Sequence, residues 1–291
     1  MGIDDVPEEA RFLFLNQEIC DARIADLSQV KTVSDAQDCM DWYWHNGHFD
    51  EGHLKFLKLG YRLIDTHPDE TGTYTTLAWI LASKWVNWHE NPSNEFGGEK
   101  RFDEAMALLE RGRLANPEDA EYHRDCADTI DPFARHYRPD LLPYVAESYE
   151  LALRYEQKPS SRLRIFLSFG ISYKRQKKWV EAFEKYKEAL LIDPENRVAL
   201  NDSGFILRKL DRLDESLQFY EHLMASYPNF IEGMLGKART LLAEKESEKA
   251  RAVYENVLQL RSRQKEALWY LNELNKTDGS AIQDYSDSPA T

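Results

Sequence analysis

The chain has 291 residues, a formal net charge of −14 and 42% apolar residues, which is enough to bury a sizeable core. No apolar run approaches the ~20 residues that a membrane-spanning helix needs, so we expect a soluble protein. The negative balance disfavours duplex DNA as a partner, because contacts to phosphates require clustered lysine and arginine. Three cysteines, Cys20, Cys39 and Cys126, fit neither a disulfide framework nor a zinc ribbon, which favours a reducing, cytoplasmic compartment.

The N-terminal half shows helical patterns at irregular spacing. Residues 1–34 are expected to be an N-terminal helical segment. Within it, residues 8–27 are predicted to form one helix that covers the first helix pair. Over 35–160 the spacing of apolar residues predicts helix pairs with inserted loops, which we interpret as irregular, acidic repeats. The expected pairs are 35–44 with 49–65, 73–88 with 102–117, and 121–130 with 142–154, and the expected long connections are 89–100 and 131–140.

The C-terminal half repeats with a step of 34 residues, which Tyr186, Tyr220 and Tyr254 mark. Two antiparallel helices approach closely only where a small side chain faces a large one. Each window therefore predicts a helix pair in which a glycine or alanine of the first helix leaves a gap and the tyrosine of the second helix fills it. The windows are 163–196, 197–230 and 231–264, and they align Gly170, Gly204 and Ala238, then Ala182, Ser216 and Ala250, then Pro194, Pro228 and Ser262.

The window 163–196 resembles a tetratricopeptide repeat. Similar matches continue across 161–264, where Ser203, Lys237 and Ser262 depart from the family pattern. These departures concern the local packing of the last repeat and leave the predicted fold unchanged. In the first window, the residues at the positions that the family marks are Phe166, Phe169, Gly170, Tyr173, Ala182, Tyr186, Ala189 and Pro194.

The resemblance implies an all-α fold, a right-handed α-solenoid of antiparallel helix pairs. Three regular repeats over 161–264 and the weaker N-terminal pairs give about six repeats, and roughly three suffice to bury a continuous core. A solenoid must cover the apolar face of its last repeat, and residues 265–276 are expected to be the capping helix. Residues 277–291 have few apolar side chains and are expected to form a disordered tail.

Charge is distributed unevenly between the two halves. Residues 1–159 hold 16 Lys and Arg against 31 Asp and Glu, whereas residues 160–291 hold 21 against 20. The regular repeats are mildly basic once the acidic tail is left out, and such a surface could steer an acidic peptide. The alternative is that both halves simply have solvated faces.

The resemblance also implies a position for a partner, because the first helices of successive pairs line the concave groove in this family. An apolar stripe edged by Arg and Lys suits an extended or helical, acidic-apolar peptide segment. For Leu167 and Leu235 the alternative of packing between neighbouring first helices stays open. The groove positions are Arg164, Leu167, Ile171, Lys174 and Arg175 in the first repeat, Val198, Asn201, Phe205, Arg208 and Lys209 in the second, and Glu232, Leu235, Arg239 and Leu242 in the third.

A carboxylate clamp for chaperone tails is not expected in these three repeats. The clamp repeats use lysine, asparagine and arginine at five positions, and this chain departs from all of them. An RNA-processing scaffold is the alternative function, because half-repeats with Trp and Tyr occur in such assemblies and the C-terminal repeats are basic. The five positions hold Leu167, Ile171, Asp202, Glu232 and Gly236.

Enzyme hypotheses rest on weaker patterns, so we expect neither a cofactor nor catalysis. Three histidines and two carboxylates lie within 45–53, but the Asn46-Gly47 turn divides them and the helical spacing of a zinc hydrolase is missing. A metal-dependent enzyme using this segment is therefore the least favoured alternative. His123-Arg124-Asp125 lacks the glycine-rich loop of a kinase, and Gly97-Gly98 lacks the lysine of a phosphate loop.

Overall fold

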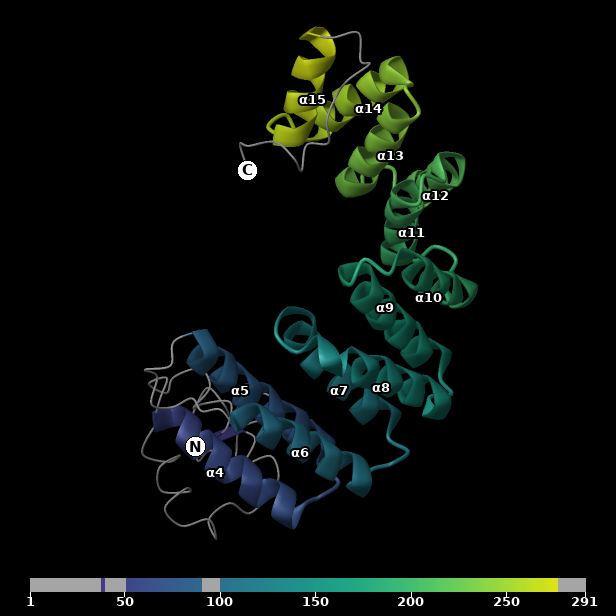
Figure 1. Ribbon diagram of the computed structural model, residues 1–291. Helices are drawn as coiled ribbons and strands as arrows, with labels where there is room; N and C mark the ends of the chain where they lie inside the picture. The colour runs from purple at the N-terminus through teal and green to yellow at the C-terminus, as the bar shows by residue number, and fades with distance from the viewer. Residues whose placement is uncertain (1–37, 40–50, 91–99, 277–291) are drawn as a thin grey trace, which may run out of the picture. The chain divides into compact units, whose positions relative to one another are not determined.

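The computed structural model describes residues 38–39, 51–90 and 100–276. Over these ranges the chain forms α-helices joined by short turns, and no strand occurs within them (Figure 1). None of the described helices is both long enough and apolar enough to span a membrane. The predicted helix 8–27, most of the helix 35–44, most of the connection 89–100 and the tail 277–291 lie outside the described residues.

The chain divides into two compact units, Met1–Tyr155 and Glu156–Thr291. Unit 1 holds two complete helix pairs, α5 with α6 and α7 with α8, and α4 packs against α5. These elements include helices over the predicted ranges 73–88, 102–117, 121–130 and 142–154 to within a few residues. Their bounds are α4 Glu51–Thr66, α5 Thr71–Glu90, α6 Arg101–Ala115, α7 Ala120–His136, the 3-10 helix η4 Pro139–Leu141, and α8 Leu142–Tyr155.

The predicted connection 131–140 is wrong, because α7 continues through Pro132 to His136. Proline cannot donate the backbone hydrogen bond of a helix interior, and this normally ends or kinks the helix. Here the extra turn buries Phe133 and Ala134. The ion pair between Arg135 Nε and the buried Asp131 Oδ2, at 2.8 Å, also holds this turn. Burial and pairing thus offset the cost of the proline.

Unit 2 is a stack of three helix pairs, α9 with α10, α11 with α12 and α13 with α14, and α15 packs on the last pair (Figure 1). A helix pair occurs in each of the three 34-residue windows, and α15 lies where the separate pattern after residue 264 predicts a final helix. The bounds are α9 Pro159–Arg175, α10 Trp179–Ile192, α11 Arg197–Lys209, α12 Leu213–Ser226, α13 Ile231–Ala243, α14 Ser247–Leu260 and α15 Lys265–Lys276.

The turn inside each pair of unit 2 has the same backbone. Lys177, Asp211 and Lys245 have φ angles of 59°, 59° and 65°, in the left-handed region, and they lie 34 residues apart. In each turn the next residue donates a backbone hydrogen bond to the carbonyl five residues earlier, which is the Schellman ending of a helix. The bonds join Lys178 N to Tyr173 O at 3.0 Å, Arg212 N to Leu207 O at 2.9 Å and Glu246 N to Leu241 O at 2.9 Å.

The core of each pair follows the predicted contact between a small and a large residue. A methyl group on Gly170 would lie 2.8 Å from a ring carbon of Tyr186, and one on Gly204 would lie 2.8 Å from the ring of Tyr220. Only glycine therefore allows these helices to approach so closely without a shift of the ring. Both tyrosines are buried, and so is Tyr254 in the third pair.

Candidate functional site

The predicted groove positions lie on α9, α11 and α13, the first helices of their pairs, and we call this surface the first-helix face. Three cations on it are exposed, namely Arg164, Arg175 and Lys209. Most other positions are partly buried, as expected for a surface stripe beside a packed core. These partly buried residues are Leu167, Ile171, Lys174, Asn201, Phe205, Arg208, Arg239 and Leu242, while Val198 and Glu232 are exposed.

Leu235 is not a surface residue, and its assignment to the groove is wrong. Its side chain is 5% exposed and belongs to a core cluster with Met234, Ala238 and Tyr254. The position therefore contributes to packing of the third pair and cannot contact a partner. Sequence spacing left both possibilities open because a leucine suits a core and a binding stripe equally well.

Phe205 is the aromatic centre of the first-helix face. Its ring stands edge-on to Trp179, with centroids 5.8 Å apart. The guanidinium carbon of Arg208 and Nζ of Lys209 each lie 5.7 Å from the Phe205 centroid. Cations at this distance are attracted to the ring face, and they also set a positive potential around a partly exposed apolar surface. We call Trp179, Phe205, Arg208 and Lys209 the Phe205 cluster.

Lys174 connects two first helices. Its Nζ donates to Oδ2 of Asp202, which is 7% exposed, and Oη of Tyr186 donates to the same oxygen at 2.8 Å. Asn201 Nδ2 donates to the other carboxylate oxygen at 3.3 Å. Burial, reinforced by the Asp202 charge, raises the pKa of Tyr186 above its ordinary value, so the phenol stays a donor. The lysine charge is thus compensated within the protein.

Arg239 plays a similar part at the end of the stack. Its guanidinium makes two hydrogen bonds to the carboxylate of Glu266 on α15, one of them from Nε to Oε1 at 2.6 Å. Burial alone would lower the pKa of Arg239, but the bonds and charge of Glu266 outweigh it and the pKa is raised. Two of the predicted groove cations, Lys174 and Arg239, therefore hold neighbouring helices together.

Unit 1 has a pocket between two of its own first helices, α5 and α7. Its volume is about 340 Å³. Trp79, 39% exposed, lies on one side, and Asp125 and Asp128 lie on the other. Arg124 pairs with Asp125, and Tyr149 donates to Asp128, so these carboxylates already have partners inside the unit. None of these residues is among the groove positions predicted from the sequence.

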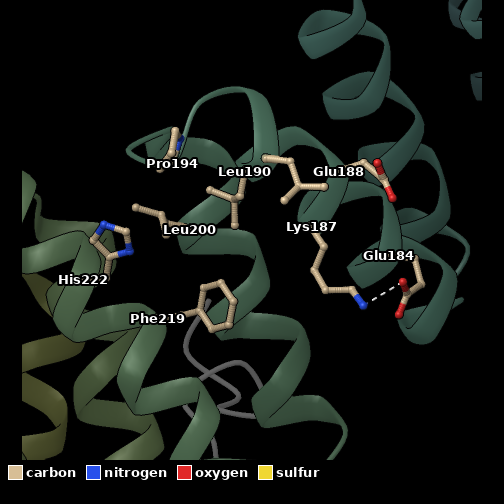
Figure 2. Close-up of a pocket in the computed structure, with 9 residues that line it drawn as sticks. Glu184, Lys187, Glu188, Leu190, Pro194, Leu200, Phe219 and His222 are labelled. Atoms are coloured by element: carbon tan, nitrogen blue, oxygen red, sulfur yellow. Dashed lines mark ion pairs between the residues drawn. The ribbon is translucent and has the colours of Figure 1, made fainter.

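A second pocket lies between the second helices α10 and α12, and we call it the second-helix pocket. It has a volume of about 430 Å³. Figure 2 shows apolar side chains from α10, α11 and α12 around it and an ion pair, Lys187 Nζ to Glu184 Oε2 at 2.8 Å, on its rim. The lining residues are Glu184, Lys187, Glu188, Leu190, Leu191, Pro194, Leu200, Phe219 and His222.

None of the predicted groove positions lines this pocket, although the repeat alignment contains a signal for it. Leu191 aligns with Ala225 and Gln259 at the 34-residue step, so the first repeat alone has a large apolar residue there. In the structure Leu191 is 78% exposed. A large apolar residue at a position that the other repeats fill with small or polar residues indicates a surface rather than a core.

The alternative sites are only partly covered by the structure. Residues 45–50 of the histidine segment lie outside the described ranges. Within 38–39, 51–90 and 100–276, no group of three or more His, Cys, Asp or Glu side chains could hold a metal ion. Cys39 and Cys126 are both buried. At the clamp positions, Asp202 is engaged by Lys174 and would repel a partner carboxylate.

Comparisons with known proteins identify the fold. No protein-family model matches the chain, and no curated protein matches it. Among solved structures, YrrB, a TPR protein with an unusual peptide-binding site, is similar at a TM-score of 0.51 and 15% identity, over 75% of this chain and 98% of YrrB. The C-terminal part of a TPR repeat-containing protein from Cytophaga hutchinsonii is similar at a TM-score of 0.60 and 14% identity, over 94% of this chain and 99% of that one. The chain therefore has the all-α fold of the tetratricopeptide-repeat proteins, as its own 34-residue pattern predicted.

Proposed function

We propose that the chain is a protein-interaction scaffold that binds a peptide segment of a partner on its first-helix face and has no catalysis of its own. The observation that carries the proposal is the Phe205 cluster, in which two cations each lie 5.7 Å from the centroid of a partly exposed aromatic ring. Apolar anchors with a polar rim are the usual source of affinity at protein interfaces. The fold supports this choice, since similar TPR structures include one whose protein has a peptide-binding site.

The proposed partner segment combines acidic and apolar residues. Leu167 and Ile171 of α9 and Phe205 of α11 are the partly buried apolar residues of these two first helices, and Arg208 and Lys209 lie over the ring of Phe205. Carboxylates of the segment would pair with these cations, while its apolar side chains would cover the stripe. Arg164, Arg175 and Lys209 are the exposed cations of this face, and we assign the recognition of charge to them together with Arg208, which lies beside the Phe205 ring.

Selection from a displayed library of random peptides on the purified chain tests the proposal. We expect enriched sequences to place Asp or Glu beside Leu, Ile or Phe. Selected peptides should bind the double variant Phe205→Ala/Arg208→Gln at least about tenfold more weakly, because an apolar anchor and a charge pair are both lost. Val180→Ala is the matched control, since Val180 is 58% exposed on α10 and lies outside the first-helix face.

Two results would contradict this placement. Equal binding to the double variant, with unchanged helicity by circular dichroism, would move the site away from Phe205. Binding of a single-stranded RNA such as polyuridylate that weakens steeply with added salt would favour the alternative of an RNA-processing scaffold, because phosphate contacts release counterions. A peptide interaction made by one or two ion pairs would respond to salt far less.

A further inference from the structure

We propose that the second-helix pocket is a second binding surface, which takes an apolar side chain from a partner segment that carries lysine or arginine beside it. This goes beyond the proposed function, because the pocket is lined mainly by α10 and α12, whereas the peptide site is placed on α9, α11 and α13. The two ligands would also have opposite charge. The chain would then join two partners of different chemistry.

The apolar part of the pocket is continuous with the core. Leu200 of α11, 1% exposed, packs with Leu190 of α10 and Phe219 of α12. Leu191 stands beside this layer and is 78% exposed. Figure 2 shows Leu190, Leu200 and Phe219 around a common space, with Pro194 above it. A hollow of about 430 Å³ with an apolar floor is within the range that side chains or small ligands fill.

The neighbouring repeats show that the fold does not require these apolar residues. At the 34-residue step, Leu191 corresponds to Ala225 and Phe219 corresponds to Val253 in the following repeat. Helix α12, which carries Ala225, still pairs with α11, and α14, which carries Val253, still pairs with α13. Leu191 lines the same pocket as Leu190, Leu200 and Phe219, so it extends an apolar patch instead of standing alone, and such patches mark contact sites.

The charges on the rim favour a basic neighbour for the apolar anchor. Lys187 is held by Glu184 at 2.8 Å and also lies 5.4 Å from the Phe183 ring. Glu188, exposed on the same rim, has no ion pair among the described residues. His222 of α12 is the other titratable group that lines the pocket. The carboxylate of Glu188 is thus the charge available to a partner, and it complements lysine or arginine.

A series of small probes with one apolar body and different charges tests this chemistry. Phenethylammonium, 2-phenylethanol and phenylacetate would each be titrated into the protein with isotope-labelled leucine methyl groups. Binding would be followed by the NMR chemical shifts of the Leu190, Leu191 and Leu200 methyl groups. We expect phenethylammonium to bind about two- to fivefold more tightly than phenylacetate, the effect of one exposed ion pair. Glu188→Gln should remove that difference while leaving 2-phenylethanol binding unchanged.

The double variant Leu191→Ala/Phe219→Val gives the pocket the residues of the following repeat, so it should fold normally. It should reduce binding of all three probes at least about fivefold, because most apolar contact is lost. Val180→Ala, which removes an exposed apolar residue elsewhere on α10, should leave them unchanged. Equal binding of the cation and the anion, or equal binding by the double variant, would overturn the proposal.

A library selection separates this surface from the peptide site. A displayed random-peptide library, selected on Phe205→Ala/Arg208→Gln, should enrich Leu, Met or Phe next to Lys or Arg, and these peptides should be lost on Leu191→Ala/Phe219→Val. Enrichment of acidic peptides only would contradict the inference even if the proposed function holds. Concentration-dependent dimers, or binding to phosphatidylcholine–phosphatidylserine vesicles, that vanish with Leu191→Ala would also overturn it, since the occupant would then be a second copy or a lipid surface.

Discussion

In both units a small residue of one helix packs against a tyrosine of another helix. The two units differ in whether the first or the second helix of a pair carries the small residue. In unit 2 the small residue is on the first helix and the tyrosine on the second, as with Gly170 and Tyr186. In unit 1 the small residue, Gly112, is on α6, the second helix of its pair. A methyl group there would lie 2.3 Å from Oη of Tyr122 on α7 and 2.9 Å from the ring of Tyr74 on α5, both first helices. Close helix approach therefore needs a small residue against a large one, but it does not fix which helix supplies which.

The ion pairs between helices also differ between the two units. In unit 2 the ion pair Lys174–Asp202 joins α9 to α11 and the ion pair Arg239–Glu266 joins α13 to α15, and both carboxylates are buried. In unit 1 the ion pair from Arg111 Nη2 to Asp65 Oδ1, at 2.8 Å, joins α6 to α4, and both side chains are about half exposed. A buried contact fixes geometry more strongly than an exposed one. The regular unit is thus the one whose repeats are tied through buried charge.

The largest expected effect concerns the glycine of unit 1. Gly112→Ala should reduce the free energy of unfolding by about 2–3 kcal/mol, because the added methyl group displaces Tyr122 and weakens its hydrogen bond to Leu109 O, which is 2.6 Å long. Gly204→Ala in unit 2 should cost less, about 1–2 kcal/mol, because the third repeat already packs Ala238 at the same position. Denaturant unfolding measures both, and a larger cost for Gly204→Ala would reverse the comparison.

The buried carboxylate of unit 2 gives the next effect. Asp202→Ala should cost about 2 kcal/mol, because the buried hydroxyl of Tyr186 loses its acceptor and Lys174 loses its counter-charge. Tyr186→Phe should cost about 1 kcal/mol, since only one hydrogen bond is removed and Lys174 stays paired. If the two variants cost the same in thermal or denaturant unfolding, the ion pair contributes nothing and the contrast between the units is weaker than described.

The third prediction compares a buried with an exposed ion pair. Glu266→Gln should destabilise the chain by about 1–2 kcal/mol, because Arg239 is then left partly buried beside a neutral amide. Asp65→Asn in unit 1 should change stability by less than about 0.5 kcal/mol, because water solvates both partners. Hydrogen exchange of the α15 amides should rise in the first variant only. Equal effects of the two substitutions would argue against a difference between the units.

The smallest expected effect has the opposite sign. Gly72 lies in the first turn of α5, and no atom of another side chain lies within 4 Å of a methyl group placed on it. Gly72→Ala should stabilise the chain by about 0.5 kcal/mol, because alanine loses less backbone entropy on folding. A rise in the unfolding midpoint checks this. Destabilisation would show that this glycine, like Gly112, is a packing residue.

Much of unit 2 could be predicted from the sequence because its signals are local and repeated. Gly170 and Tyr186 lie 16 residues apart, within one window, and both recur as Gly204 and Tyr220. In unit 1 the partners of Gly112 come from different pairs, so no fixed step relates them. Pro132 misled the prediction of α7, because proline ends most helices unless burial of the next turn outweighs the lost hydrogen bond.

The site was harder to predict than the fold. Lys174 and Arg239 have the spacing of groove cations, but their partners, Asp202 and Glu266, lie 28 and 27 residues further along the chain. The repeat places those carboxylates on the next first helix, yet spacing alone does not reveal that they point back. The sequence therefore indicated which helices carry the charged residues, and the structure showed which of those residues form ion pairs within the protein.

The ion pair between Lys174 and Asp202 has a consequence for how this chain could change length. The 34-residue windows have the same length and could be expected to replace one another. The ion pair, however, crosses the boundary between the first window and the second. Deleting residues 197–230 would place Gly236 where Asp202 now lies, leaving Lys174 and the buried Tyr186 hydroxyl without a carboxylate. Repeats of equal length are thus not equivalent, because each one supplies charged side chains that form ion pairs with the next repeat.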